Sequence, residues 1–291
     1  MKKRTVAIIG AGKVGSVLAK ALYRQGYELV GISSRTLESA SQLAEEFAIG
    51  ATTKAADITL HADMILIATP DRCIGQVVEE LVKDGGVRAG QFLFHTSGGV
   101  GVEVLNPARH LGVYTGSIHP LQSFADRQCS VADIYFALGG DEKAIGLAEE
   151  IVGTFGGKSF IISDKDRPLY HGAACIVSNY FVSLMHWATQ IYTGFGLSPQ
   201  QAAAALMPLV QGTVTNIQHL GPTAALTGPI SRGDVSTIAA HLAGFNNENE
   251  KKLYAELGRY TIGVALEKGS INEEQANAVK ELLTCGMERI S

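Results

Sequence analysis

Residues 10 to 15, GAGKVG, have the glycine spacing of a phosphate-binding turn. A short β-branched apolar run, Thr5 to Ile9, precedes them, and apolar residues at helical spacing follow. In such a strand, turn and helix, Gly10 permits the tight turn, Gly12 lets the backbone approach a pyrophosphate, and Gly15 lets helix and strand pack closely. Unpaired N–H groups at the start of the helix face the anion. The alternative is a glycine-rich turn without a ligand; we favour a dinucleotide site formed by Gly10, Gly12, Lys13, Val14 and Gly15.

The end of the second expected strand indicates which dinucleotide binds. NAD sites place an acidic residue here, where it binds the ribose 2′-hydroxyl. In this chain the segment GISSRT supplies Ser33, Ser34 and Arg35 and no carboxylate. Because hydroxyls and a guanidinium suit a 2′-phosphate, we expect NADP(H) as the cofactor. Alternatively, Ser34 and Thr36 cap the next helix and Arg35 is solvated, although capping and phosphate binding can coexist.

Two later strand ends are expected to face the same cofactor, because open α/β sheets bind ligands at the carboxyl ends of their strands. The segment IATPD contributes Ala68, Thr69 and Pro70. The segment FHTSGG contributes Thr96, Ser97 and Gly98, after His95. Small residues there let a nicotinamide ribose pass close to the backbone. Taken alone, either segment is equally well explained as an ordinary strand-to-loop turn.

Histidines are the candidates for proton transfer. In GSIHPLQSF, His119 follows an expected strand and stands in the expected cleft, where it could contact substrate or move a proton. The alternative is a histidine that satisfies a local hydrogen bond. His171 and Ser178 are two helical turns apart and share a face, with Asn179 at its edge.

Ser178 and Asn179 stand amid the apolar letters ACIVSNYF, so we expect them in a mostly buried stretch. A buried amide needs hydrogen-bond partners. Asn179 is therefore a candidate to bind a substrate carboxylate or carbonyl, with interhelical hydrogen bonding as the alternative, above all for Ser178. The loop LTGPISRGD could present Arg232 to an anionic substrate. Equally, Arg232 and Asp234 could pair and cap a helix that begins near Val235.

The elements that must position these residues fall into two halves. Apolar β-branched runs alternate with helical periodicity, which predicts βαβ units and a parallel sheet. The expected strands are 5–9, 28–32, 64–68, 91–94, 113–118, 135–138 and 158–162. From about residue 164 the pattern is helical, with starts at Pro168 and Pro199, a kink expected at Pro208, and further helices around 248–268 and 272–287. We therefore predict an α/β fold, with an N-terminal Rossmann-type parallel sheet over residues 1–163 and an all-helical C-terminal domain over residues 164–291.

Composition limits the class of protein. The chain has 291 residues, of which 46% are hydrophobic and 18% charged, as in a soluble two-domain protein. A net charge of −4 gives no reason to expect nucleic acid or a membrane surface as partner. The apolar run that follows the basic first residues ends at Gly10, too short for a secretory signal, and no stretch reaches transmembrane length. No cysteine pair or metal-ligand spacing occurs, so we expect no metal and a reducing cytoplasm; the four cysteines are Cys73, Cys129, Cys175 and Cys285.

The chain resembles a known superfamily. The order of its segments resembles that of the pyrroline-5-carboxylate reductase and 6-phosphogluconate dehydrogenase-like superfamily: GAGKVG, then SSR, then an all-helical half. More narrowly, HPLQSFAD, YHGAACIVSNYF and LTGPISRGD resemble bacterial Rossmann-like proteins with a C-terminal domain of unknown function. The resemblance covers nearly the whole chain. It implies an oxidoreductase that forms a homodimer through its helical domains, with the active site between domains, and some members of the narrow group look like an alternative ketopantoate reductase.

One departure from the superfamily affects the mechanism. Its hydroxyacid dehydrogenases use a helix lysine four residues before an asparagine, and aligning that asparagine with Asn179 puts Cys175 at the lysine position. We expect His171, His119 or water to supply the proton instead. The resulting hypothesis is an NADPH-dependent reductase of a 2-oxo acid such as ketopantoate, or of a cyclic imine such as pyrroline-5-carboxylate, with Asn179 and Arg232 orienting the substrate. The rival hypothesis is a non-catalytic NADP(H)-binding sensor or interaction protein.

Overall fold

The chain divides into two compact units, residues 1–183 and 184–291, and the first contains the sheet. The computed structural model describes residues 3–288. The helix that begins at Arg167 groups with the sheet-containing unit. The domain boundary expected after residue 163 stays a prediction.

The strands described within residues 3–288 form one sheet of eight, in the order β3-β2-β1-β4-β5-β6-β7-β8. Their bounds are β1 Thr5–Ile9, β2 Glu28–Ser33, β3 Ala51–Thr52, β4 Met64–Ile67, β5 Phe92–His95, β6 Tyr114–Pro120, β7 Tyr135–Gly140 and β8 Lys158–Ile161. Neighbouring strands are parallel except β6 and β7, which are antiparallel. The predicted α/β fold with an N-terminal Rossmann-type sheet is confirmed. The predicted parallel pairing fails at this one pair, because a loop without a crossover helix joins β6 to β7 and the chain reverses.

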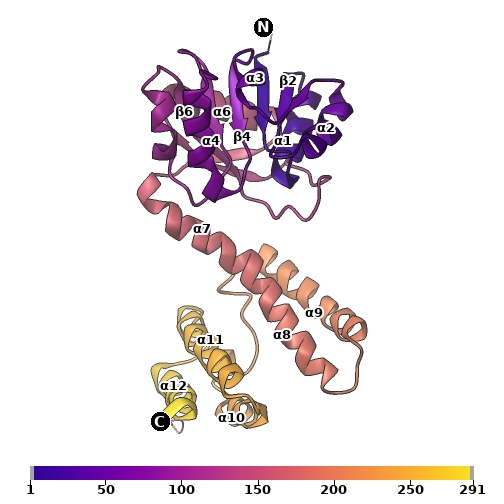
Figure 1. Ribbon diagram of the computed structural model, residues 1–291. Coiled ribbons are helices and arrows are strands. Elements are labelled where there is room, and N and C mark those ends of the chain that lie inside the picture. The colour runs from indigo at the N-terminus through magenta and orange to yellow at the C-terminus, as the bar shows by residue number, and fades with distance from the viewer. Residues whose placement is uncertain (1–2, 289–291) are drawn as a thin grey trace. The chain divides into compact units, whose positions relative to one another are not determined.

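Helices lie on both faces of this sheet (Figure 1). Their bounds are α1 Lys13–Arg24, α2 Leu37–Ala44, α3 Ala56–Thr59, α4 Asp71–Lys83, α5 Asn106–Arg109 and α6 Glu142–Thr154, with 3₁₀ turns η1 Glu45–Phe47, η2 Val102–Leu105 and η3 Asp164–Asp166. On one face α1, α2 and α6 bury Leu18, Leu43 and Ile151 against the strands. On the other, α4 buries Ile74 and Leu81. Apolar residues spaced three or four apart give each helix this single buried side.

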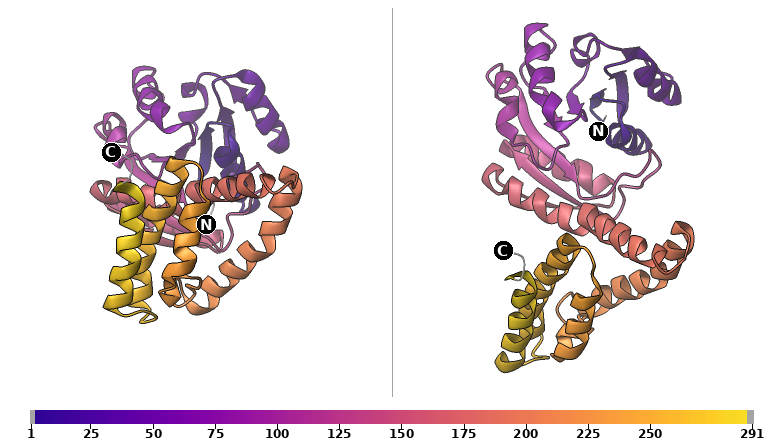
Figure 2. Two further views of the ribbon diagram at one scale, coloured as in Figure 1. Left: turned by 90° about the horizontal axis from the view of Figure 1, so that it is seen from below. Right: turned by 60° about the horizontal axis from the view of Figure 1, so that its bottom comes forward.

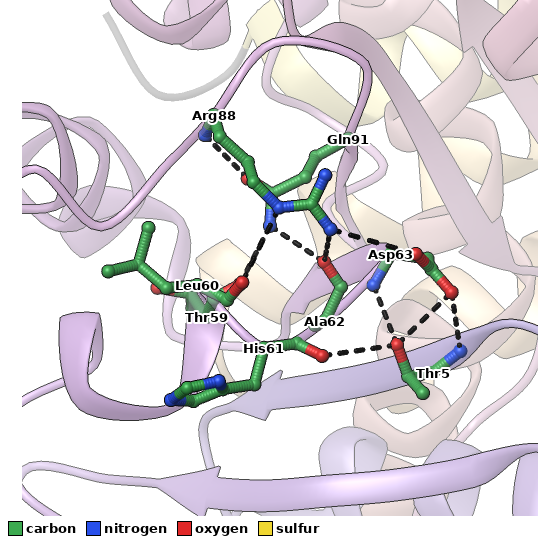
Figure 3. Close-up of polar contacts among 8 residues, drawn as sticks. All are labelled: Thr5, Thr59, Leu60, His61, Ala62, Asp63, Arg88 and Gln91. Carbon is green, nitrogen blue, oxygen red and sulfur yellow. Dashed lines mark hydrogen bonds and ion pairs between the residues drawn. The ribbon is translucent and has the colours of Figure 1, made fainter.

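Polar contacts hold the amino-terminal edge of the sheet together (Figure 3). Gln91 is fully buried just before β5. Its Nε2 donates to the carbonyl oxygens of Thr59 and Ala62, each at 2.7 Å. Its Oε1 accepts from the backbone N–H of Arg88 at 2.7 Å. This network ties the loop before β4 to the start of β5, at the edge opposite the carboxyl ends of the strands.

The second half is helical, as the sequence predicts (Figure 2). The bounds are α7 Arg167–Cys175, a π-helical turn η4 Ile176–Tyr180, α8 Phe181–Thr193, α9 Pro199–Leu220, a 3₁₀ turn η5 Ile230–Arg232, α10 Val235–Gly244, α11 Glu248–Glu267 and α12 Glu273–Glu288. Ser198 and Gln201 form a reciprocal capping box at the start of α9, and this helix continues across Pro208.

In the second unit, α10, α11 and α12 share a core that includes Ile238, Leu242, Ile262 and Val279. The second half of α9 has no buried side, unlike α10, α11 and α12, because every residue from Gln211 to Leu220 is exposed. None of the helices in the described part of the chain has the length and apolar character needed to cross a membrane.

Candidate functional site

The glycine turn lies where the strand order reverses, since β1 has β2 on one side and β4 on the other. Gly10 has φ +109°, and a Cβ there would lie 2.5 Å from the carbonyl oxygen of Ala68. A Cβ on Gly15 would lie 1.9 Å from the carbonyl oxygen of Gly10. A Cβ on Gly12 would meet nothing within 4 Å. Packing therefore requires Gly10 and Gly15, whereas Gly12 faces open space in front of the turn.

The start of α1 fits a bound phosphate. Lys13 opens the helix and Gly12 precedes it, with no side chain capping the first turn. The N–H groups of Lys13, Val14 and Gly15 are therefore free to face an anion, and the helix dipole favours negative charge there. With the open space beside Gly12, the turn meets the geometric requirements of a pyrophosphate cradle.

The end of β2 lies against this turn, because Gly10 N donates to the Ser33 carbonyl oxygen at 2.7 Å. Thr36 caps α2, its Oγ1 accepting from the backbone N–H of Ser39 at 3.4 Å. The capping alternative thus holds for Thr36 and not for Ser34. Ser34 is half-buried and Arg35 is exposed, and neither side chain has a partner among the described residues. Both remain available to a 2′-phosphate.

The ends of β4 and β5 follow the same edge of the sheet. Ala68 and Pro70 flank Thr69, whose buried Oγ1 has no partner among the described residues. Ser97 Oγ accepts from the N–H groups of Gly99 and Val100, at 3.2 and 3.0 Å. The Ser97 hydroxyl is therefore engaged in its own turn, as the turn interpretation of FHTSGG predicts. Thr96 and Gly98 are buried beside it.

A second loop reaches the glycine turn. Arg127, in the loop between β6 and β7, donates from Nη2 to the Ala11 carbonyl oxygen at 3.2 Å and from Nη1 to Gln42 Oε1 at 2.8 Å. This guanidinium adds positive charge beside the start of α1. The sequence analysis missed Arg127, because nothing local indicates that this loop folds back onto a turn so distant in the chain.

The two candidate histidines are brought together. His119 lies on β6 and His171 on α7, with their ring centroids 6.3 Å apart. His119 Nδ1 is 2.6 Å from the hydroxyl oxygen of Tyr170. The loop after β5 packs on both rings, since a Cβ on Gly98 would lie 2.8 Å from His119 and one on Gly99 would lie 3.5 Å from His171. The sequence analysis gave Tyr170 no role in the site; its only local signal is its place beside His171 in YHGAAC.

Burial and charge determine the protonation of this pair. Burial, then the neighbouring His171 and Arg167, lower the pKa of His119 to about 4, against the opposing effect of Asp71. Burial raises the pKa of Tyr170 to about 12. At neutral pH the imidazole is therefore uncharged and the phenol keeps its proton. We assign the Tyr170 hydroxyl as the donor to Nδ1, which leaves the histidine proton on Nε2. Nε2 has no partner among the described residues and is not one of their buried unpartnered polar atoms, so its N–H is open to a ligand.

Behind this pair lies a polar network centred on the buried Arg167. Arg167, at the start of α7, bonds through Nε to Asp164 Oδ1 at 2.8 Å and through Nη2 to Ser117 Oγ. His95 is fully buried nearby, and burial, then the Arg167 charge, lower its pKa to about 3. Hydrogen bonding to Asp164 raises the pKa of Glu103, and the hydrogen bonds from Glu103 and Arg167 lower that of Asp164 to about 2, against the effect of its own burial.

Two family matches agree with this arrangement. Residues 1–120 match the family described as a Rossmann-like domain, and residues 134–261 match the one described as a domain of unknown function, DUF2520. The chain combines a Rossmann-like domain with a DUF2520 domain. The narrower resemblance seen in the sequence is thereby confirmed. The DUF2520 match contains Arg167, Tyr170 and His171, and the Rossmann-like match contains the glycine turn and His119.

Solved structures share this fold. A protein from Bacteroides fragilis, provisionally named an NADP oxidoreductase, is 25% identical with a TM-score of 0.75, over 90% of this chain and 99% of that one. The Thermotoga maritima protein TM1727 is 28% identical with a TM-score of 0.72, over 90% and 99%. A pyrroline-5-carboxylate reductase from Streptococcus pyogenes, at 16% identity with a TM-score of 0.58 over 99% and 100%, shares the fold.

Curated relatives match a short segment. A glutamyl-tRNA reductase from Ectopseudomonas mendocina is 39% identical over 64 residues, which is 21% of this chain and 15% of that protein. The chain therefore spans a small fraction of the length of the curated relatives it matches.

The remaining candidate residues, Ser178, Asn179 and Arg232, lie within the segment that matches DUF2520. Ser178 and Asn179 lie on the π-helical turn, where Ser178 is half-buried and Asn179 exposed. The expected burial of this stretch is wrong, because neighbouring apolar side chains such as Val177, 76% exposed, also face outward in the single chain. Cys175 Sγ is 3.7 Å from His171 Nε2.

Arg232 ends the 3₁₀ turn η5 in the second unit and is exposed. Asp234 caps α10, accepting from the backbone N–H of Thr237 at 3.0 Å. Hydrogen bonds from Thr237 and Ser236 lower the pKa of Asp234 to about 2. Asp234 therefore caps α10, as one alternative predicted. Among the described residues it forms no hydrogen bond or ion pair with Arg232, so the Arg232 guanidinium is available to a ligand.

Proposed function

We propose that this chain is an NADP(H)-dependent oxidoreductase that reduces a small carbonyl compound, a 2-oxo acid such as ketopantoate, or a cyclic imine such as pyrroline-5-carboxylate. The observation that carries this proposal is the glycine turn, with open space at Gly12 and an uncapped α1, beside a strand end that offers Ser34 and Arg35 without a carboxylate. The name of the Bacteroides fragilis relative and the reductases that share the fold support the same class.

In this proposal the cofactor, when bound, supplies hydride. The glycine turn holds its pyrophosphate, with Gly10, Gly12, Lys13, Val14 and Gly15 as the contacting residues. Ser33, Ser34 and Arg35 receive the 2′-phosphate end. The strand ends line the path of the nicotinamide ribose through Ala68, Thr69, Pro70, Thr96, Ser97 and Gly98.

His119 is the proposed proton donor in place of the missing lysine. Its Nε2–H is open to a ligand, and Tyr170 donates to Nδ1 from behind. As Nε2 gives its proton to the carbonyl oxygen or imine nitrogen that has received hydride, the Tyr170 proton moves to Nδ1, so the imidazole ring remains neutral. The Tyr170 phenolate that is left takes a proton back from solvent, which its raised pKa of about 12 favours. His171 lies beside the pair and is the second candidate. Ser178, Asn179 and Arg232 are the proposed contacts for an anionic substrate.

We propose further that the protein acts as a homodimer in the cytoplasm. Apolar side chains on the long helical segments support association, because Leu169 is 81% exposed, Val177 76% and Leu209 69%. The superfamily resemblance supports a dimer contact on these helices. The cytoplasmic location is supported by the spacing of the cysteines, which shows no paired motif.

The test is NADPH oxidation, followed by loss of its absorbance, with ketopantoate, pyrroline-5-carboxylate and other 2-oxo acids. We expect rapid turnover of one substrate, a loss of about a hundredfold or more in kcat for His119→Asn, and wild-type kcat for His110→Asn at an exposed histidine.

Ser34→Ala and Arg35→Ala should weaken binding of NADPH far more than of NADH, and equal losses would refute the 2′-phosphate assignment. Tight NADPH binding without turnover of any substrate would favour the sensor hypothesis instead.

A further inference from the structure

Arg167 is a fully buried cation whose contacts are incomplete. Its side chain has 0% exposed surface, and Nη1 has no partner in the described part of the chain. Burying a guanidinium costs free energy that one ion pair seldom recovers, and apolar side chains often replace such pairs without loss of stability. Stability alone is therefore a weak explanation for this residue.

The contacts of Arg167 join strand β6 to helix α7. Nη2 donates to Ser117 Oγ, two residues before His119 on the strand. Arg167 is also the first residue of α7, one turn before Tyr170 and next to the turn that carries His171. The two elements that supply the His119–Tyr170 hydrogen bond are thus tied together at this guanidinium.

The same guanidinium reaches the loop after β5 through Asp164. Asp164 Oδ1 is 2.8 Å from Arg167 Nε, and its Oδ2 accepts from the backbone N–H of Val102 at 2.9 Å. That loop carries Gly98 and Gly99, which pack on the two histidine rings. All three segments that shape the candidate site therefore meet at one Arg–Asp pair.

We propose that Arg167 is the positioning residue of this site, fixing β6, α7 and the loop after β5 relative to one another so that His119, Tyr170 and His171 meet. The role assigned to these three residues rests on the proposed function, but the geometric claim does not. Arg167 does not itself contact the open Nε2 of His119; it acts through Ser117 and through the first turn of α7.

The charge of Arg167 gives the proposal a measurable signature. The charged and titratable groups that face His119 are His171, Arg167, Asp71, His95 and the Tyr170 hydroxyl. Burial is the largest cause of the lowered pKa of His119, and among its neighbours Arg167 comes second, after His171. Removing the guanidinium while keeping the fold should therefore raise the pKa of His119.

The experiment compares Arg167→Met and Arg167→Lys with Arg109→Met. Arg109 is a matched control, because it bonds Thr115 on the same strand and Asp141 at 2.8 Å, away from the histidines. NMR titration of the histidine rings in the protein without substrate gives each pKa. We expect the pKa of His119 to rise by about one unit or more in Arg167→Met. We also expect the ring shift caused by the Tyr170 hydrogen bond to disappear, while Arg109→Met leaves both unchanged.

Ser117→Ala keeps the test decisive if Arg167→Met does not fold, since it removes a hydroxyl and no charge. It should weaken the Tyr170–His119 hydrogen bond and shift the His119 resonances. Arg167→Lys retains the charge and loses the fork of donors, so the pKa should stay low while the hydrogen-bond signal weakens. An unaltered His119 spectrum in the folded variants would overturn the proposal. Because no turnover is needed, failure of the reductase assay and failure of this test are distinguishable.

Discussion

At the scale of single residues, the glycines of the GAGKVG turn differ in what a methyl group would meet. On Gly15 it would lie 1.9 Å from a backbone oxygen, and on Gly12 it would enter open space. We expect Gly15→Ala to lower the free energy of unfolding by roughly 2 kcal/mol or more, because backbone must move. We expect Gly12→Ala to fold with near wild-type stability and to bind NADPH about tenfold or more weakly. Urea unfolding and fluorescence titration measure the two effects, and unaltered NADPH binding by Gly12→Ala would contradict the cradle.

Two histidines with lowered pKa values, the buried His95 and the half-buried His119, make the stability of the fold depend on pH. The pKa values of His95 and His119 are about 3 and about 4 in the folded chain, below the ordinary 6.5. In the window between these values and 6.5, the unfolded chain binds protons that the folded chain does not. The free energy of unfolding should therefore fall as pH falls through this window, by roughly 2–4 kcal/mol after allowance for solvent access.

Urea unfolding at a series of pH values between 7 and about 4.5 tests this dependence. His119→Gln should show a shallower fall than wild type, because one of the two histidine contributions is gone. The lowered pKa of Asp164, about 2, adds a loss of stability below the ordinary carboxyl value of 3.8. A flat profile for wild type through the histidine window would contradict the burial of both rings as neutral groups.

At the scale of elements, the sequence predicts those helices and strands whose signals lie within a few adjacent residues. Strand β1 is predicted by its apolar run, and the start of α9 by Ser198 and Pro199, because each signal lies within a few adjacent residues. Strand β3, Ala51–Thr52, is not predicted, since two residues are too short to show alternation. The antiparallel pairing of β6 with β7 depends on how a long loop returns, which periodicity does not describe.

The candidate site shows the same limit. His119 and His171 could each be proposed from residue type and place, but their meeting depends on residues about fifty positions apart. Tyr170 and Arg167 carried no distinguishing signal, because a tyrosine and an arginine at a helix start have many ordinary roles. The expected burial of Asn179 was wrong because apolar neighbours indicate a contact surface without indicating whether the same chain covers it.

The network around Gln91 gives a prediction about how elements are joined. Its amide satisfies two carbonyl oxygens and one N–H in a fully buried position. We expect Gln91→Ala to lower the free energy of unfolding by roughly 1–3 kcal/mol, because the Arg88 N–H loses its partner and the Thr59 and Ala62 carbonyl oxygens each lose one of two donors. Gln76→Ala is the control, since the exposed Gln76 bonds the Glu80 side chain on α4, and it should cost less than about 0.5 kcal/mol. Urea unfolding measures both, and equal small losses would contradict the network's role.

At the scale of the whole molecule, each unit leaves an apolar helical surface uncovered. In the first unit Leu169, Val177 and Val182 are 81%, 76% and 66% exposed, and in the second Leu209 is 69% exposed. Monomeric proteins seldom keep such surfaces in water, because burying apolar area stabilises by about 25 cal/mol per Å². The chain in solution should therefore bury these side chains against a second copy.

The corresponding prediction concerns mass in solution. Sedimentation velocity should give a dimer for the wild-type chain at micromolar concentration. Val177→Asp and Leu209→Asp should each shift the equilibrium toward monomer, because a carboxylate in an apolar contact loses its hydration without gaining a partner. Leu111→Asp, at an exposed leucine that follows α5, changes an apolar side chain to the same carboxylate away from these helices and should leave the dimer intact. A wild-type monomer would exclude the dimer, and equal effects of all three substitutions would place the contact elsewhere.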